Sequence, residues 1–556
     1  RFQWTAPIHI SPHQPKTVYH AANVLFRSTD AGQSWEAISG DLTRNDKSKQ
    51  KWSGGPITGD NTGVEIYCTI FAVAESPLEK GLIWAGSDDG LVHITRDNGK
   101  TWKNVTAALA GLPQWATVRV IEPSRFDAGT AYLVADNHRL DDVKPYLYKT
   151  TDFGVSWVRL DASLPQDVYL HVVREDPSDR NFLYLGTERG LAFSRDGGKT
   201  WRSLRSNLPT VAVHDLAIRN GSLIAGTMGR SVYVLDHLSP LREYGQETSL
   251  LKIPDAIAWQ RDSRPRDRFS GDNPPSGASI YYFLKEPTKG EIKIEILDAA
   301  NQVIRTLSSK PETPTGSSDN LAMALEAAKR AALPNEAGLN RGLWDLHYRG
   351  SEMILNAKVD MGDARRGPLA LPGAYTVRMT VDGKTFTQPL RVSADPRETV
   401  SPADREAQFR LSLEMRDSIT RITKIVNDIR SIRKQLTERN ALLASNAKAD
   451  QLRKDSAALT TVLDKLEDDL HNKAAEVVYD ILAFKGGTKL YSRMIWTYTQ
   501  LNDGTGAPTQ GVKEVYAGQK AELSKYDSQY KKLADADLGT LNLAAKKLEL
   551  PHVIVP

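Results

Sequence analysis

Charged and amide side chains recur at matching places in this sequence, each time just after a short apolar segment. Packing of the hydrophobic core does not require a charged residue at each of these positions. Loops that converge on one face of a protein commonly form its binding site. Turn formation and surface ion pairs are the alternative explanation of the same residues. The candidate ligand-binding residues are Asp60, Asn61, Glu65, Asp88, Asp89, Asn137, His138, Arg139, Asp141, Asp142, Glu188, Arg189 and Arg230.

The carboxylates in this set could cut a glycosidic bond. That reaction uses two carboxyl groups about 5 to 10 Å apart across the sugar. A sialidase would also need three arginines for the carboxylate of its substrate, and the Arg-Ile-Pro element that usually marks the first of them does not occur in the chain. The carboxylates that could form a glycosidase pair are Asp60, Glu65, Asp88, Asp89, Asp141 and Asp142.

Other chemistries find little support in the sequence. It contains no phosphate-binding loop, nucleophile elbow or zinc-protease helix motif. We expect no cofactor and no dedicated metal site, although Asp and Asn oxygens in converging loops would suit calcium. The 72 lysines and arginines barely exceed the 68 acidic residues, so nucleic acid is not an expected partner. The one cysteine, Cys68, has apolar neighbours and is expected in the core.

The segments that must position these residues belong to a repeat. The pattern Ser-x-Asp-x-Gly-x-Ser/Thr-Trp, or its Thr-initial form, occurs at 28–35, 95–102, 150–157 and 194–201. In each copy the Asp carboxylate and the hydroxyl can bond backbone amides across a tight turn, the Gly permits positive φ, and the Trp can bury its ring between sheets. We therefore assign a structural role to Asp30, Trp35, Asp97, Trp102, Asp152, Trp157, Asp196 and Trp201. A catalytic role for the four aspartates is the less favoured alternative.

Alternating apolar strands surround each copy of the motif, which predicts four strands per repeat. The repeats run from Ile8 to Ile38, Ile70 to Val105, Val118 to Leu160 and Leu170 to Leu204, and strands over 213–235 form a fifth without the motif. Four-stranded sheets arranged radially make a β-propeller. Because the first repeat begins on an innermost strand, we expect an N-terminal portion outside this sequence, or a second chain, to complete the ring.

These motifs resemble the Asp-box (BNR-repeat) superfamily, which includes sialidases, sortilin-type receptors and photosystem II assembly propellers. The stretches 59–65, 136–139 and 226–231 resemble more closely large bacterial proteins often labelled glycosyl hydrolases with BNR repeats, or sortilin-like. In the last stretch the related pattern Gly-Thr-His-Gly-Arg has Met228 in place of the His, which weakens any role for a side chain there. The resemblance implies hydrolase ancestry and a secreted, periplasmic or cell-surface bacterial protein.

Three further regions follow the propeller at 1–240. Residues 241–277 are rich in Pro and predict a linker, and alternating strands over 278–396 predict a β-sandwich that resembles an Ig-like domain. A short helix over 321–333 is expected to interrupt it. From 401 to 556 the apolar spacing changes to that of helices, predicting a helical hairpin or bundle. No apolar run approaches the roughly 18 residues of a membrane span. The predicted fold class is mainly β with an α-helical C-terminal part.

Two functions remain open from these observations. The favoured one is an extracytoplasmic binding or scaffold propeller that recognises a polypeptide or glycan through its axial loops, and that is not an enzyme. The alternative is a glycoside hydrolase with paired carboxylates on the same face.

Overall fold

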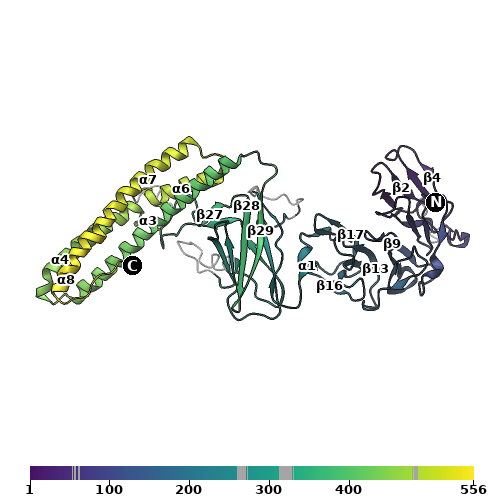
Figure 1. Cartoon of the computed structure of the whole chain (residues 1–556), viewed down its shortest axis with the longest axis horizontal. Coiled ribbons are helices and arrows are strands. Elements are labelled where there is room, and N and C mark those ends of the chain that lie inside the picture. Colours follow the sequence, from purple (N-terminus) through teal and green to yellow (C-terminus); the bar gives the residue numbers. More distant parts are fainter. Residues whose placement is uncertain are drawn as a thin grey trace. The chain divides into compact units, whose positions relative to one another are not determined.

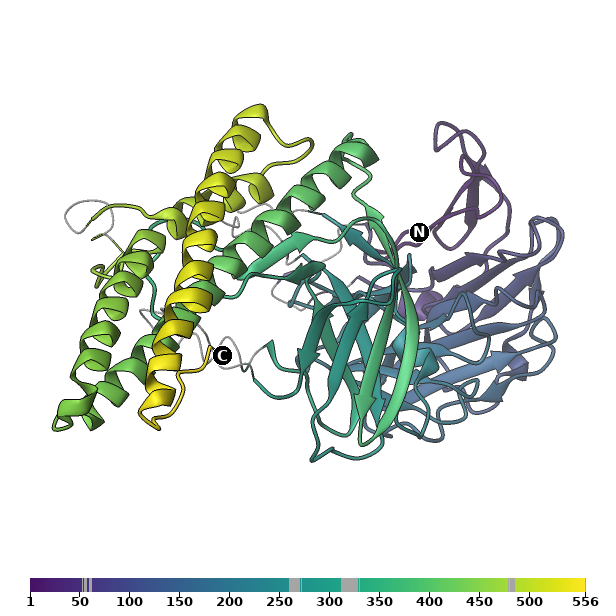
Figure 2. The same ribbon diagram turned by 60° about the vertical axis from the view of Figure 1, so that its left-hand side comes forward.

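The computed structural model describes residues 1–52, 54, 58–59, 63–259, 271, 273–311, 329, 331–478, 480 and 486–555. The chain divides into two compact units, Arg1–Arg242 and Glu243–Pro556. Figure 1 labels the elements along the chain, and Figure 2 gives a second view. Asp60, Asn61 and most of the helix expected at 321–333 lie outside the described residues.

The first unit consists of antiparallel sheets built from consecutive strands. Four sheets have four strands each, and a fifth has three, in the orders β1-β2-β3-β4, β5-β6-β7-β8, β12-β11-β10-β9, β13-β14-β15-β16 and β17-β18-β19. The strands are β1 Ile8–Ile10, β2 Val18–Ala21, β3 Leu25–Ser28, β4 Glu36–Ala37, β5 Ile70–Glu75, β6 Ile83–Ser87, β7 Val92–Thr95, β8 Lys103–Asn104, β9 Thr117–Pro123, β10 Ala131–Asn137, β11 Asp142–Thr150, β12 Val158–Arg159, β13 Leu170–Glu175, β14 Leu183–Thr187, β15 Gly190–Ser194, β16 Arg202–Leu204, β17 Val213–Arg219, β18 Ser222–Thr227 and β19 Val232–Leu235. Helix α1, Ser239–Glu243, follows. The predicted four-stranded repeats are present; their closure into a propeller stays a prediction.

The repeated motif forms the same turn in all four of these sheets. In the second sheet, Asp97 accepts hydrogen bonds from the backbone N of Thr101 at 2.9 Å and from its hydroxyl at 2.6 Å, and Thr95 Oγ1 accepts from the N of Gly99 at 3.0 Å. Equivalent bonds hold the other three turns. The motif thus fastens the hairpin between the third and fourth strands, as its residues predict.

The motif tryptophans lie at the same place in four different sheets, but their burial differs. Trp102 donates to the carbonyl oxygen of Ile38 in the preceding sheet at 2.9 Å, Trp201 donates to that of Leu160 at 2.8 Å, and Trp157 is 9% exposed against Trp84. Trp35 is 44% exposed. The expectation that all four are buried thus holds for Trp157, while Trp102 and Trp201 are half-buried. It is wrong for Trp35, because no other sheet within the described residues covers it.

The second unit begins with two sheets that share one core. Their orders are β20-β22-β25 and β21-β29-β28-β23-β24, with a hairpin β26-β27 beside them. The strands are β20 Ser249–Leu250, β21 Ala256–Ala258, β22 Ala278–Leu284, β23 Lys293–Leu297, β24 Val303–Ser308, β25 Gly338–Trp344, β26 His347–Arg349, β27 Arg366–Leu369, β28 Gly373–Val381 and β29 Lys384–Ala394. Trp344, Tyr282 and Ile294 are fully buried between the sheets.

The segment 241–277 differs from the linker that its prolines predict. Strand β20 pairs with β22, and β21 pairs in parallel with β29, which lies more than a hundred residues later in the chain. Leu250, Ile253 and Ala258 are buried in the core of the sheets. Apolar burial thus recruits these short stretches into the sheets despite their weak local pattern.

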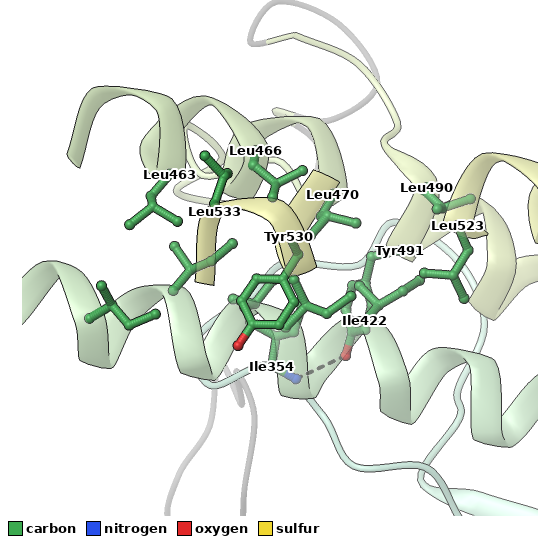
Figure 3. Close-up of a cluster of buried hydrophobic side chains, with 14 of the residues drawn as sticks. Ile354, Ile422, Leu463, Leu466, Leu470, Leu490, Tyr491, Leu523, Tyr530 and Leu533 are labelled. Atoms are coloured by element: carbon green, nitrogen blue, oxygen red, sulfur yellow. Dashed lines mark hydrogen bonds between the residues drawn. The ribbon is translucent and has the colours of Figure 1, made fainter. Parts of the chain in front are cut away.

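Helices form the rest of the second unit. They are α3 Pro402–Leu442, α4 Asp450–Leu470, α6 Leu490–Asp503, α7 Gln510–Lys531 and α8 Leu538–Lys547. Ser401 caps α3 by accepting from the N of Asp404, as is typical of a helix start. Figure 3 shows how Ile422, Leu463 and Tyr530 from three helices meet in one core, where the N of Ile354 donates to the Tyr491 hydroxyl at 3.1 Å. No helix in the described part of the chain is long and apolar enough to cross a membrane.

Candidate functional site

A β-bulge recurs where the first strand begins in four of the five sheets of the first unit, and it sets the geometry of the site. In the second to fifth sheets the pairing with the second strand skips one residue, and those residues are Phe71, Arg119, His171 and His214. A bulge turns the extra residue out of the regular pleat and is common beside functional sites. The same irregularity thus presents four side chains from neighbouring sheets.

Three of these bulge residues contact one another. Arg119 Nη2 donates to Nδ1 of His171 at 2.8 Å, and the ring of His171 lies 4.1 Å from that of His214, centroid to centroid. The Arg119 guanidinium also lies 5.6 Å from the centre of the Phe71 ring. His171 is buried, Arg119 is half-buried and His214 is exposed, so the cluster reaches from the interior to the solvent.

Acidic residues at the ends of the second strands complete this cluster. Glu188 follows β14, and its Oε2 lies 2.8 Å from Nε2 of His171. Asp136, at the end of β10, forms a short hydrogen bond with Nδ1 of His138 and has its Oδ2 3.2 Å from Nε of Arg119. That Oδ2 is buried and accepts no hydrogen bond in the structure. We call Arg119, Asp136, His138, Tyr169, His171, Glu188 and His214 the bulge cluster.

Tyr169 contacts two imidazole rings of the cluster. The ring of His138 stacks on it at 4.5 Å between centroids, with 7° between the planes, and the ring of His171 lies 5.2 Å away at an angle of 63°. The main-chain N of Glu188 donates to the carbonyl oxygen of Tyr169. Tyr169 therefore contacts both His138 and Glu188.

Burial and hydrogen bonds set the ionisation of the cluster. Burial lowers the pKa of His171 to about 4, since the charged imidazolium loses its hydration and stands beside Arg119. For Glu188, burial acts to raise the pKa, but hydrogen bonds from His171 and Tyr169 bring it below its ordinary value. Burial and the hydrogen bond to Glu188 raise the pKa of Tyr169 to about 12. At neutral pH Glu188 is an anion beside a neutral His171.

The other candidates from the sequence are dispersed. Asp88 and Asp89 are buried within the second sheet: Asp88 accepts from the N and Oγ1 of Thr69, and Asp89 accepts from the N of Arg44. Burial raises the pKa of Asp88 to about 6. Glu65 accepts from Trp4 Nε1 at 2.9 Å. These hydrogen bonds connect different segments of the first unit. A ligand-binding role for Asp88, Asp89 and Glu65 stays a prediction.

Polar side chains in the loop after β10 bond mainly to residues of that loop and of the strand that follows it. Asp142 accepts from the Tyr146 hydroxyl at 2.6 Å and lies near Asn137, and Asp141 ends a short turn with φ +62°. Arg139 is exposed. Arg189 pairs with Asp167 at the surface, and Arg230 is exposed in the turn before β19. Of the residues predicted from the loops, the structure brings His138 and Glu188 into one cluster.

The sequence analysis placed the site in loops and therefore missed five residues of the cluster: Arg119, Asp136, Tyr169, His171 and His214. A signal was available in the strands themselves. In the triplets Val118-Arg119-Val120, Leu170-His171-Val172 and Val213-His214-Asp215, an Arg or His directly follows an apolar residue near the start of the first strand of a sheet. The donor atoms of His171, Glu188 and His214 lie within 4.8 Å of one another, so these three could also hold a metal ion.

Comparisons with known proteins give one curated relative and several solved structures. The chain is 27% identical over 187 residues to the oligoxyloglucan-reducing end-specific xyloglucanase of Emericella nidulans, covering 33% of this chain and a fifth, 20%, of that protein. No protein-family model matches the chain.

Two of the similar structures are enzymes of the GH74 family. The xyloglucanase of Xanthomonas campestris has a TM-score of 0.32 and 16% identity, covering 68% of this chain and 62% of that one. The enzyme of Niastella koreensis has a TM-score of 0.29 and 12% identity, covering 70% of this chain and 54% of that one. These likenesses are too low to support an argument by themselves.

The sequence match corrects one expectation. From the residues alone we favoured a binding protein without catalytic activity, since no carboxylate pair could be assigned. The matched relative is a xyloglucanase, and this finding points to a glycoside hydrolase instead.

Proposed function

We propose that this chain is part of a secreted glycoside hydrolase with a β-propeller and that it acts on a β-glucan related to xyloglucan. The observation that carries the proposal is the 27% identity over 187 residues to a xyloglucanase. The five consecutive antiparallel sheets support the propeller, since their strand order follows the chain in every sheet.

The bulge cluster is the proposed site of cleavage. Its two acidic residues come from neighbouring sheets, and the ring of Tyr169 stacks on that of His138. A glycosidase needs one group that donates a proton to the leaving oxygen and one carboxylate on the other side of the sugar. The accessible carboxylate of Glu188 can fill the second role.

The proton donor in this proposal is His138. Its ring is 29% exposed, and its Nδ1 forms a hydrogen bond with the buried Asp136, which orients the ring. The other ring nitrogen then carries the proton toward the sugar. Asp136 acts as a positioning residue, because its side chain is only 2% exposed.

A further segment of protein is proposed to cover the first sheet. Trp35, Ile8 and Ile10 are exposed there at 44%, 70% and 61%, whereas each later motif tryptophan packs against the sheet that precedes its own. A sheet from an N-terminal portion or from a second chain would remove this apolar surface from water.

The test is hydrolysis of xyloglucan oligosaccharides by the purified chain, alone and as part of the full-length protein. Glu188→Gln should reduce kcat by about 100- to 10,000-fold, because a neutral amide cannot act as base or nucleophile. His138→Gln should also lower kcat, because a glutamine amide cannot donate a proton to the leaving oxygen. Asp196→Asn, in the motif turn of the same sheet, should leave turnover unchanged.

Two outcomes would contradict this function. The first is the absence of turnover on every glycan tested in the full-length protein. The second is turnover that Glu188→Gln leaves at the wild-type rate, which would place the chemistry outside the bulge cluster.

A further inference from the structure

Two imidazoles and a carboxylate meet in the bulge cluster in an arrangement that suits a metal ion. His171 from β13, Glu188 after β14 and His214 from β17 each offer one donor atom, all within 4.8 Å of one another. They come from two adjacent sheets: His171 and His214 each lie between two paired strand residues, and Glu188 directly follows the paired Thr187. His214 is exposed and gives the cluster an opening to solvent.

The hydrogen bond from Arg119 determines where His171 carries its proton. A guanidinium can only donate, so Nδ1 of His171, 2.8 Å from Arg119 Nη2, must be the unprotonated nitrogen. Nε2 then carries the proton and donates to Glu188 at 2.8 Å. A metal ion at Nε2 would have to displace this proton, which would move to Nδ1 and face Arg119.

Arg119 has another partner within reach. Asp136 Oδ2 lies 3.2 Å from its Nε and accepts no hydrogen bond in the structure. A small turn of the guanidinium toward this carboxylate would release Nδ1 of His171 and satisfy a buried oxygen. Arg119 is therefore a group that can either hold His171 or leave it free.

We propose that His171, Glu188 and His214 bind a zinc-type transition ion, and that Arg119 competes with this ion for His171. Two imidazole nitrogens and one carboxylate oxygen are a known zinc ligand set that leaves a fourth position open. Calcium prefers six or more oxygen ligands, so this cluster does not favour the ion that the loop residues suggested.

Metal binding would also regulate the hydrolase. This part rests on the proposed function, because Glu188 is both a metal ligand and the carboxylate assigned to cleavage. An ion held by Glu188 makes that carboxylate unavailable to the sugar, so zinc should inhibit turnover.

The test measures binding directly by calorimetry with Zn²⁺ and by the visible absorption of bound Co²⁺. We expect one ion per chain, with imidazole-type Co²⁺ bands. His214→Ala should weaken Zn²⁺ binding at least about tenfold through loss of a ligand. Arg119→Gln should tighten it about tenfold, since the amide oxygen can accept from Nδ1–H of His171 as outer partners of metal-bound histidines do. The exposed His552 gives a control, and His552→Ala should bind as the wild type does.

The results separate the two proposals. Failure to bind Zn²⁺ or Co²⁺ with one-to-one stoichiometry would overturn the metal site, as would binding that His214→Ala leaves unchanged in a variant with the wild-type melting curve. Unaltered affinity in Arg119→Gln would overturn the competition by Arg119. None of these readouts depends on hydrolysis, so a chain that binds zinc but cuts no glycan contradicts only the proposed function.

Discussion

The first sheet and the second share the same motif but differ in what their motif residues touch. In both, the Asp side chain is bonded to the residue four positions later, through its N at 2.9 Å and its hydroxyl at 2.6 Å. Trp102 reaches the carbonyl oxygen of Ile38 in the neighbouring sheet, whereas Trp35 bonds only within its own turn, to Gly32 at 3.1 Å. The turn is thus a local structure, and the packing of the Trp depends on a neighbour.

The largest expected contrast comes from removing a motif tryptophan. Trp157→Ala should lower the free energy of unfolding by about 3 to 5 kcal/mol, since the ring is 9% exposed and packs edge-on against Trp84 at 5.9 Å. Trp35→Ala should cost under about 1 kcal/mol, because its ring is already 44% exposed. Urea unfolding of the two variants, followed by circular dichroism, measures the difference.

An equal loss in both variants would contradict the comparison. It would mean that Trp35 is already covered when this chain is alone in solution, as it would be if a second copy of the chain supplied the proposed additional sheet. Sedimentation of the same samples then tells whether a second copy of the chain supplies the cover.

A smaller contrast is expected at the motif glycines. Gly32 and Gly99 have nearly the same φ, +91° and +90°, so substitution by alanine introduces the same backbone strain at both positions. A Cβ at Gly99 would lie 2.8 Å from the carbonyl oxygen of Ile38, whereas at Gly32 the nearest atom is 3.8 Å away on Trp35. Gly99→Ala should therefore be less stable than Gly32→Ala by about 1 to 3 kcal/mol. Thermal unfolding of the pair would refute this if the two melting temperatures coincide.

The repeated sheets were predictable from sequence because their signals are local. The motif and the alternation around it predict the strands from β1 to β19 with small differences at the ends. Strands β20 and β21 were not predictable, because two or three residues carry no periodicity and pair with strands far along the chain. There, tertiary burial decides the structure and local pattern does not.

The site was only half predictable for a related reason. Glu188 and His138 follow apolar strands and stand out as polar loop residues, but His171 and His214 lie inside strands whose apolar neighbours conceal them. A β-bulge has no characteristic amino-acid composition. The sequence therefore does not show that these side chains turn out of the regular strand pairing. Reading the same strand position across successive repeats is what reveals Arg119, His171 and His214 together.

The smallest expected contrast concerns the motif aspartates. Hydrogen bonds from the hydroxyl and then the backbone N of Ser34 lower the pKa of Asp30 to about 2, and those from Thr101 lower the pKa of Asp97 to about 2. Because both values are depressed in the folded chain, each ionised carboxylate contributes stability above its ordinary pKa of 3.8, and this contribution is lost as the pH falls toward about 2.

A titration followed by NMR of the carboxyl carbons, with the two signals assigned through Asp30→Asn and Asp97→Asn, should therefore give the same low pKa in both sheets. Asp30 has an exposed Trp beside it and Asp97 a covered one, so equal values mean that the turn forms without a neighbouring sheet. An ordinary pKa for Asp30 together with a low one for Asp97 would show instead that the turn itself needs the neighbour, and the separation between local bonding and packing would fail.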